Sequence, residues 1–207
     1  MARVGRKNSP RIGSRLDRSE SSIPIGWSDN PSRWTARLLT ATVSFIGFGV
    51  AFYLSLYEIG FIRNVWEPFF GNGVYVVLDS PLTRKLPIPD AVLGALGYLL
   101  ETVLILAGNS NRWHDQPWLV TSYGLVAICL GMVSLLLLVY QTVLLRVWCT
   151  LCIISAIIST GLMVPALNEL FACCQFLKRS AVQGNSAWRA FWGLDLETVQ
   201  ALEKRME

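Results

Sequence analysis

Residues 147–168 read VWCTLCIISAIISTGLMVPALN, an uncharged apolar run that carries two cysteines near its start. A run of this length can cross a bilayer as a helix, since roughly 17–25 apolar residues span the hydrocarbon core. Three further apolar runs lie before it, at residues 38–57, 88–107 and 118–145. The chain is 53% hydrophobic and 15% charged, whereas soluble domains carry about 25% charged residues. We therefore expect an all-α integral membrane protein, built as a four-transmembrane-helix bundle.

The basic residues predict how the chain crosses the membrane. Of the 18 lysines and arginines, eight lie in residues 1–37 and five follow Asn168, while only three lie between the first two apolar runs. Cytoplasmic segments are enriched in lysine and arginine, so both termini are expected in the cytoplasm of a plasma (bacterial inner) membrane protein. The connection at residues 58–87 and the start of the last run then face the outside, where disulfides persist.

The segments that flank the apolar runs are more polar. Residues 1–33 are expected to form a basic, disordered cytoplasmic tail. They lack the short apolar core of a cleavable signal, although an Arg- and Ser-rich start also resembles an organelle transit peptide. Residues 34–174 are expected to form the membrane domain, and residues 175–207 a cytoplasmic tail. In that tail, apolar residues at helical spacing from Trp188 predict an amphipathic helix against the membrane or a partner, with Asp195 as an N-cap.

The connection at residues 58–87 is unusually apolar for a loop in water. Three aromatic residues, Trp66, Phe69 and Phe70, precede the apolar run at residues 74–78. Aromatic side chains are enriched at membrane interfaces whatever their function. We therefore expect an outside loop that lies on the membrane or caps the helical bundle.

Cys149 and Cys152 form a Cys-x-x-Cys pair at the outer start of the last apolar run. The two-residue spacer lets the sulfurs meet on one helical turn, and a helix N-terminus beside a cation such as Arg146 stabilises a thiolate. The pattern favours a redox dithiol over two packed cysteines, although three other cysteines show that the chain also uses this residue elsewhere. A metal site is disfavoured, because the one histidine, His114, is predicted on the opposite side of the membrane.

Two motifs together resemble the vitamin K epoxide reductase family. The first is a loop serine in VLDSP at residues 77–81, followed by LPIP at residues 86–89 and the glycine-rich LGALGY at residues 93–98. The second is an aromatic residue before the dithiol, in WCTLC at residues 148–152. The order of these elements and the outward-facing dithiol agree with the family, although its usual Gly-Ile-Pro step is replaced by LPIP in this chain.

The resemblance implies a four-helix bundle that encloses a quinone, of the ubiquinone or menaquinone type, beside the dithiol. It implies that Cys152 faces and reduces the quinone, while Cys149 receives electrons from a thiol protein of the thioredoxin-like kind. It also implies that Ser80 and Trp148 lie at the quinone site. The function expected on this basis is that of a membrane thiol–quinone oxidoreductase, which passes electrons from thiols through the Cys-x-x-Cys pair to the quinone.

The first loop departs from the family, which usually carries two more cysteines there to shuttle electrons from an outside thiol protein. Residues 58–87 contain no cysteine, and Val74 occupies the position six residues before Ser80. Either a partner thiol reaches Cys149 directly, or the chain is a catalytically degenerate accessory subunit of a larger, quinone-linked membrane complex. Nucleic-acid and nucleotide binding are disfavoured, since no phosphate-cradling glycine loop is apparent and topology explains the basic residues.

Glu101 is an ionisable residue inside the second apolar run. Such a group costs about 2.5–3.5 kcal/mol at the centre of a span, so it faces the bundle interior or water. It is a candidate residue of the quinone site, as part of a proton path. The alternative is a neutral carboxyl group that is hydrogen-bonded to a neighbour or lies near the inner interface. The glycines in the apolar runs are all expected where helices pack closely; they are Gly47, Gly49, Gly94, Gly97, Gly124, Gly131 and Gly161.

Overall fold

The computed structural model describes residues 23–24, 27–80, 89–182 and 186–194. Every regular element in these residues is a helix, which confirms the predicted all-α class for the described part of the chain. The elements are α2 (Trp34–Glu58), α3 (Gly73–Leu78), α5 (Asp90–Leu106), α6 (Arg112–Asp115), α7 (Pro117–Tyr140), the π-helical turn η1 (Gln141–Leu145), α8 (Thr150–Val182) and α9 (Ala187–Phe191). The chain divides into two units, residues 1–30 and 31–207, and the helices all belong to the second.

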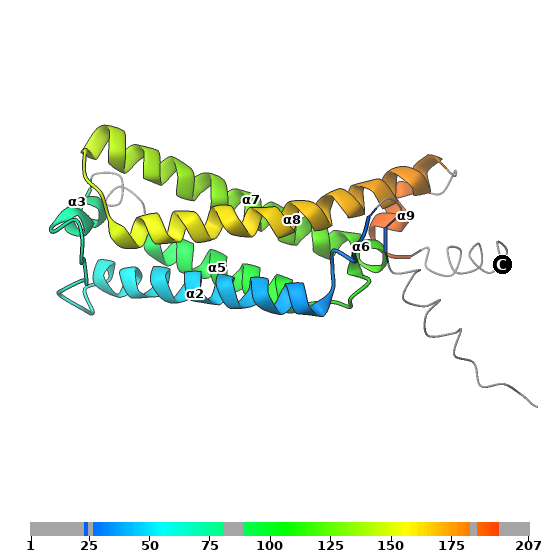
Figure 1. The fold of residues 1–207 in the computed structure, drawn as a ribbon, viewed down its shortest axis with the longest axis horizontal. Coiled ribbons are helices and arrows are strands. Elements are labelled where there is room, and N and C mark those ends of the chain that lie inside the picture. The colour runs from blue at the N-terminus through cyan, green and yellow to red at the C-terminus, as the bar shows by residue number, and fades with distance from the viewer. Residues whose placement is uncertain (1–22, 25–26, 81–88, 183–185, 195–207) are drawn as a thin grey trace, which may run out of the picture. The chain divides into compact units, whose positions relative to one another are not determined.

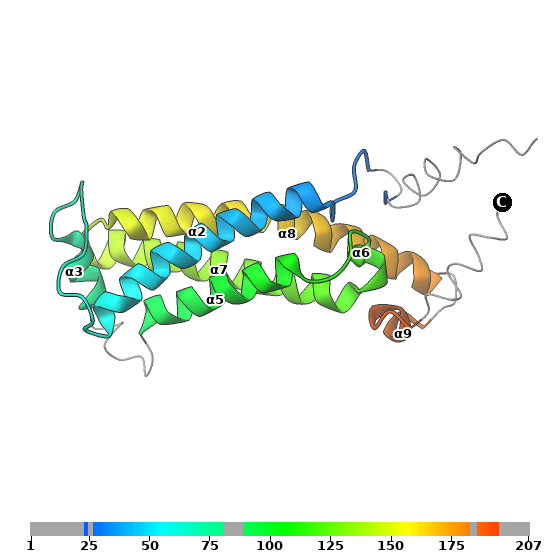
Figure 2. The same cartoon turned by 90° about the horizontal axis from the view of Figure 1, so that it is seen from below.

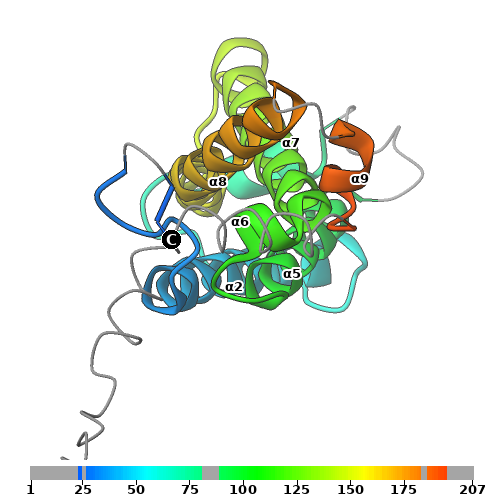
Figure 3. The same cartoon turned by 90° about the vertical axis from the view of Figure 1, so that its right-hand side faces the viewer.

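Four long helices, α2, α5, α7 and α8, lie side by side in this second unit (Figures 1 and 2). The closest pairs are α2 with α5 and α7 with α8, and the end-on view shows how the two pairs stack (Figure 3). The short helix α3 lies at one end of the bundle, while α6 and α9 lie at the other (Figure 1). Residues 1–22, which make up most of the predicted disordered tail, lie outside the described residues. The same holds for residues 195–207, which make up most of the predicted amphipathic helix.

Three helices in the described part of the chain are long and apolar enough to cross a membrane: α2, α7 continued by η1, and α8. The fourth long helix, α5, has only 17 residues, at the lower limit of the length that spans a hydrocarbon core. The chain is therefore a helical membrane protein with three candidate spans, and the predicted count of four spans stays a prediction.

Small residues allow the helices to approach closely. A Cβ atom added at Gly47 of α2 would lie 2.6 Å from Cε1 of Tyr98 of α5, and one at Gly97 would lie 2.6 Å from Cδ2 of Leu130 of α7. At Gly131 the added atom would collide with Met163 of α8. These three contacts agree with the expected use of glycine at helix interfaces, where lipid offers no hydrophobic driving force and packing holds helices together. The expectation was wrong for Gly49 and Gly161, where an added Cβ atom would meet nothing within 4 Å.

Two buried arginines bind the carbonyl groups at the C-terminal end of α5. Arg37 donates from Nε to Ile105 O at 2.8 Å and from Nη2 to Ala107 O at 2.6 Å. Arg112 donates from Nη1 to Ile105 O at 3.0 Å and pairs with Glu169 of α8, with Nη2 to Oε2 at 2.6 Å. The last carbonyls of a helix lack partners inside the helix, so these side chains stabilise the C-terminal end of α5. We call Arg37, Arg112 and Glu169 the arginine cluster.

The last long helix extends beyond the predicted span. It begins at Thr150 and continues through Val182, past both the predicted end of the span at residue 168 and the predicted domain boundary at residue 174. Beyond it, α9 forms one short helical turn at the position where the predicted amphipathic helix begins, and Trp188 is 69% exposed. Asp195, the predicted N-cap of that helix, lies outside the described residues.

Candidate redox site

The dithiol lies at the N-terminal end of α8. Cys149 directly precedes the helix, and its carbonyl accepts the N–H of Ile153 at 3.0 Å, which is the first hydrogen bond of the helical ladder. Its sulfur accepts the backbone N–H of Cys152 at 3.2 Å. The Cys149 side chain thus takes the place of an N-cap, because it bonds a helical N–H that lacks a partner in the preceding turn. Both cysteines are free thiols in this structure.

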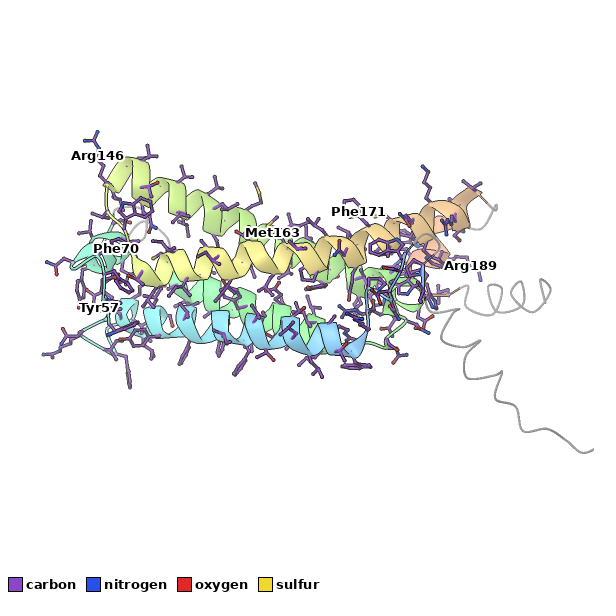
Figure 4. All side chains as sticks on the ribbon, viewed as in Figure 1. Tyr57, Phe70, Arg146, Met163, Phe171 and Arg189 are labelled. Carbon is purple, nitrogen blue, oxygen red and sulfur yellow. The ribbon has the colours of Figure 1, made fainter. Side chains whose placement is uncertain are left out.

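This geometry favours the thiolate form of Cys149. A hydrogen bond from the Cys152 thiol is the largest influence that lowers the pKa of Cys149, and the backbone N–H groups of Cys152 and Leu151 add to it. Burial and the nearby Glu67 carboxylate act in the opposite direction. The predicted cation Arg146 is instead exposed, and Figure 4 shows it directed away from the helices. The hydrogen bonds of the α8 N-terminus therefore provide the activation expected from a dithiol at a helix end.

A cap formed by α3 and the preceding loop covers Cys149. Val74 and Leu78 of α3 pack with Cys149 in one buried cluster, and both Val74 and Cys149 are 0% exposed. Gly73 makes this approach possible, since a Cβ atom there would collide with the carbonyl oxygen of Trp148. Of the two arrangements predicted for this loop, the structure shows the cap on the bundle end. Val74 contributes an apolar side chain to that cap.

Glu67 fastens the cap to α8. Its Oε2 accepts the backbone N–H of Thr150 at 3.0 Å, and its Oε1 accepts the Thr150 hydroxyl. The first turn of α8 has no acidic residue of its own, so a carboxylate from the loop meets the positive end of the helix dipole. Sequence reasoning missed Glu67, because the two residues are 83 positions apart. The one available signal was a single carboxylate between the loop aromatics.

A pair of carboxyl groups lies at the same end of the bundle as Cys152. Glu58, at the end of α2, accepts the N–H of Ala91 at 3.0 Å, and its side chain also contacts the Asp90 carboxyl group. Asp90 is within electrostatic range of the Cys152 thiol. Oε1 of Glu58 and Oδ1 of Asp90 are buried, with no hydrogen-bond partner among the described residues. The two carboxyl groups therefore contact each other at the end of the bundle that carries the dithiol.

The structure gathers some of the predicted site residues and separates others. Ser80 is 4% exposed and follows directly after α3, two residues beyond Leu78 of the cap. Trp148 is 49% exposed and its ring lies 6.2 Å from that of Phe70, which Figure 4 shows at the same end of the bundle as the start of α8. Ser80 and Trp148 are thus close in the chain to the cap and to the dithiol, and a shared quinone site for them stays a prediction. No described hydrogen bond joins either residue to Glu101.

Glu101 lies in a different part of the bundle. It is about 16 Å along α5 from Asp90, at about 1.5 Å per residue. The side chain is 1% exposed and its Oε2 accepts a hydrogen bond from Ser44 of α2 at 3.1 Å. This contact matches the expected alternative of a carboxyl group hydrogen-bonded to a neighbour. A proton path from Glu101 to the dithiol stays a prediction.

The other cysteines are remote from the pair. Cys173 and Cys174 follow Cys152 on the same helix by about 32 Å at about 1.5 Å per residue, and Cys129 is an exposed residue in the middle of α7. None of them can reach the dithiol in this fold. Among the described residues, no group of three or more His, Cys, Asp or Glu side chains is arranged to hold a metal ion.

Comparison with known proteins agrees with this geometry. The sequence profile described as the vitamin K epoxide reductase family matches residues 38–167, more than half of the 207 residues. No curated protein matches the chain. The profile match indicates a membrane thiol-dependent oxidoreductase in general terms, and this family generally uses quinone-type substrates. The dithiol, its cap and all four long helices except the end of α8 lie largely within the matched residues. The chain therefore belongs to the vitamin K epoxide reductase family.

Proposed function

We propose that the chain is a membrane thiol–quinone oxidoreductase, in which Cys149 and Cys152 pass electrons from thiols to a quinone of the ubiquinone or menaquinone type. The observation that carries the proposal is the free Cys149–Cys152 pair at the N-terminus of α8, with the Cys149 sulfur hydrogen-bonded to the Cys152 N–H at 3.2 Å. Two buried thiols that only fill space need no hydrogen bond that favours the thiolate, whereas a redox dithiol reacts through its thiolate.

The chemistry is an exchange of two electrons and two protons. In the first half, a thiolate of a thioredoxin-like partner attacks the Cys149 sulfur of the Cys149–Cys152 disulfide and releases Cys152. A second partner thiol then displaces Cys149, which leaves the partner as a disulfide and the pair as a dithiol. In the second half, the dithiol returns to the disulfide, and its two electrons and two protons convert the quinone to the quinol. The structure has the pair in its dithiol form.

The residues next to Cys152 fit a quinone. Ring reduction creates two hydroxyl groups, and a hydroxyl needs an acceptor when it is buried. The carboxyl groups of Glu58 and Asp90 offer buried oxygens that are suitable acceptors. Trp148 and Phe70 add aromatic surface at the same end of the bundle. We place the quinone on the Cys152 side of the dithiol for these reasons.

The proposed topology has four spans, with α5 as the shortest, and both termini in the cytoplasm. The dithiol, α3 and the cap then face the outside of a plasma (bacterial inner) membrane. The asymmetric distribution of basic residues supports this orientation. The short α5 is compatible with it, because the arginine cluster binds the carbonyls with which α5 ends.

The cap favours a second candidate function. Cys149 is 0% exposed beneath Val74 and Leu78, and residues 58–87 contain no cysteine that could relay electrons to it. A partner thiol can attack Cys149 only after the cap moves. A catalytically degenerate accessory subunit of a larger quinone-linked membrane complex, with the cap permanently closed, is therefore the alternative. Such a subunit would copurify with a fixed stoichiometry of other membrane proteins.

The test is quinone reduction by the purified protein in detergent. We expect the reduced protein to reduce decylubiquinone or menadione with loss of two thiols per quinol formed. Cys149→Ser and Cys152→Ser should each abolish the reaction, while Cys129→Ser and Cys174→Ser, the matched controls, should leave it unchanged. Unchanged rates in both dithiol variants would eliminate the oxidoreductase function and leave the accessory subunit.

A further inference from the structure

The short helix α9 presents apolar side chains at the end of the bundle opposite the dithiol. Trp188 is 69% exposed, Trp192 is 47% exposed and Leu194 is 66% exposed, whereas Ala190 is 3% exposed. The rings of Trp188 and Trp192 are in contact, with centroids 5.9 Å apart. Contiguous exposed apolar surface marks a place where a protein or a membrane binds, so the position of α9 on the bundle decides between these two.

Two contacts place α9 at the level where the apolar span of α7 begins. The ring of Trp192 stacks on that of Trp118, the second residue of α7, with centroids 6.5 Å apart. Gly193, with φ of 72°, lies so close to α6 that a Cβ atom there would collide with the carbonyl oxygen of Asp115. Figure 3 shows α9 beside α7. The span of α7 starts at Pro117, so α9 lies beside the boundary between hydrocarbon and lipid headgroups.

Two exposed basic residues of α8 lie just beyond the same boundary. The Cys173 thiol donates to the carbonyl of Pro117 at 3.8 Å, which places Cys173 at the level where the span of α7 starts. Lys178 and Arg179, both exposed, follow Cys173 along α8 by about 7–9 Å at about 1.5 Å per residue. The headgroup region is about 5–8 Å thick on each side of the hydrocarbon core. The charged ends of both side chains therefore lie at the level of the lipid phosphates.

The charge of this surface suits an anionic lipid. Within the described residues of α8 and α9, the one acidic residue is Glu169, which is buried in its ion pair with Arg112. These two helices therefore offer no exposed carboxylate to offset the charges of Lys178 and Arg179. A basic residue close to a membrane that contains anionic phospholipid strengthens binding about fivefold.

We propose that α9 and the C-terminal end of α8 bind anionic phospholipid, with Trp188 and Trp192 at the upper acyl chains and Lys178 and Arg179 at the phosphates. Tryptophan favours this boundary because its ring is apolar and its N–H is polar. The match in level favours lipid over a protein partner, since a protein could cover α9 at any height along the bundle. The proposal does not depend on quinone reduction, and α9 lies outside the residues that match the family, 38–167.

The first test uses the full-length chain, labelled with fluorotryptophan, in nanodiscs of phosphatidylcholine and phosphatidylglycerol. Trp188→Phe assigns the fluorine resonance of Trp188, and Trp113→Phe assigns that of Trp113, which is 9% exposed at the same end of the bundle. We expect lipid with a nitroxide in its upper acyl chain to broaden the Trp188 resonance more than that of Trp113. Broadening of the Trp188 resonance by a water-soluble gadolinium chelate alone would place α9 in water and overturn the proposal. Protection from both reagents would show that a protein partner or a second copy covers α9, which also overturns it.

The second test measures the charges. Native mass spectrometry of the full chain, equilibrated with equal amounts of the two lipids, gives the ratio of bound phosphatidylglycerol to bound phosphatidylcholine. The double variant Lys178→Gln with Arg179→Gln should lower this ratio about fivefold or more. The matched control, Lys178→Arg with Arg179→Lys, keeps both charges and should keep the ratio. An equal ratio in the neutral variant and the wild type would overturn the assignment of anionic headgroups to these residues.

Discussion

At one end of the bundle, Arg37 and Arg112 have a hydrogen-bond partner for each guanidinium nitrogen, drawn from the carbonyls that end α5 and from Glu169. At the dithiol end, buried polar atoms of Glu58 and Asp90 lack partners among the described residues. The side-chain Nε2 of Gln141 also lies at the dithiol end and has no hydrogen-bond partner among the described residues. Glu101 Oε1, in the middle of the bundle, also has no partner among the described residues. The guanidinium groups of the arginine cluster are therefore fully bonded, whereas several buried polar atoms elsewhere in the same helices are not.

The difference separates stability from chemistry. A satisfied buried network holds one arrangement of helices, whereas a buried donor or acceptor without a partner costs about 1–3 kcal/mol each. Native proteins retain such costs mainly where another molecule completes the bonds or a reaction uses them. The arginine cluster therefore stabilises α5 and α8, whereas the polar atoms at the dithiol end are those that the proposed quinone would engage. Variants at each end should change different measurements.

The largest effect on stability is expected from Arg112→Met. The variant leaves Glu169 as a buried charge without its partner and frees the carbonyls at the end of α5. Breaking a buried ion pair in this way typically costs about 3–5 kcal/mol. Denaturant unfolding in detergent, followed by circular dichroism, measures the loss. Arg179→Met, on an exposed position of the same helix α8, is the control and should cost little.

At temperatures where Arg112→Met stays folded, its quinone reduction should match that of the wild type, because the arginine cluster lies at the end remote from the dithiol. A variant that is fully stable yet inactive would contradict the separation of the two ends.

Gly73→Ala is the matching change at the dithiol end. The new Cβ atom would collide with the carbonyl oxygen of Trp148, so α3 cannot stay packed against Cys149. We expect alkylation of Cys149 by iodoacetamide, measured by peptide mass spectrometry, to become about tenfold faster, which corresponds to about 1.4 kcal/mol. Gly49→Ala is the control, since a Cβ atom there meets nothing within 4 Å.

If the cap limits access of a partner thiol, Gly73→Ala should also speed reduction of the Cys149–Cys152 disulfide by an external dithiol. Equal rates in wild type and Gly73→Ala for both reactions would show that the cap does not limit access.

The contrast between the ends also shows what sequence reasoning can reach. The apolar runs and the Cys-x-x-Cys pair are local patterns, and they located the long helices and the dithiol. The cap was one of two predicted arrangements, because loop aromatics favour the membrane surface and a bundle end equally. The length of α8 was underestimated, since its continuation beyond residue 168 is held by packing against α6 and α9 rather than by an apolar run.

The polar contacts that distinguish the ends were not predictable, because they join residues far apart in the chain. Arg112 and Glu169 are 57 positions apart, and Glu67 and Thr150 are 83. Either arginine reads in sequence as part of a basic loop or helix end.

Glu67→Gln should have a smaller effect than Gly73→Ala. The amide keeps one acceptor for the N–H of Thr150 but loses the charge that meets the α8 dipole. We expect a loss of about 1 kcal/mol in unfolding free energy, as for a weakened helix cap.

The variant also removes a charge that opposes the Cys149 thiolate, so the pKa of Cys149 should fall. Thermal unfolding and the pH profile of Cys149 alkylation measure the two effects separately. A rise in this pKa would contradict the position assigned to Glu67.

The smallest expected change concerns the pH dependence of Cys149 itself. The thiolate is the nucleophile, so below the pKa its alkylation rate rises about tenfold per pH unit. Because hydrogen bonds from Cys152 and from backbone N–H groups lower this pKa, the wild-type profile should reach its plateau at lower pH than an ordinary cysteine. Cys152→Ala removes the side-chain hydrogen bond but keeps the backbone N–H groups. Its profile should therefore shift to higher pH without reaching that of an unfolded peptide.

A background of Cys129→Ser and Cys174→Ser removes the two exposed thiols from the measurement. A Cys152→Ala profile that reaches its plateau at lower pH than the wild-type profile would contradict the Cys152 hydrogen bond as a cause of the lowered pKa of Cys149.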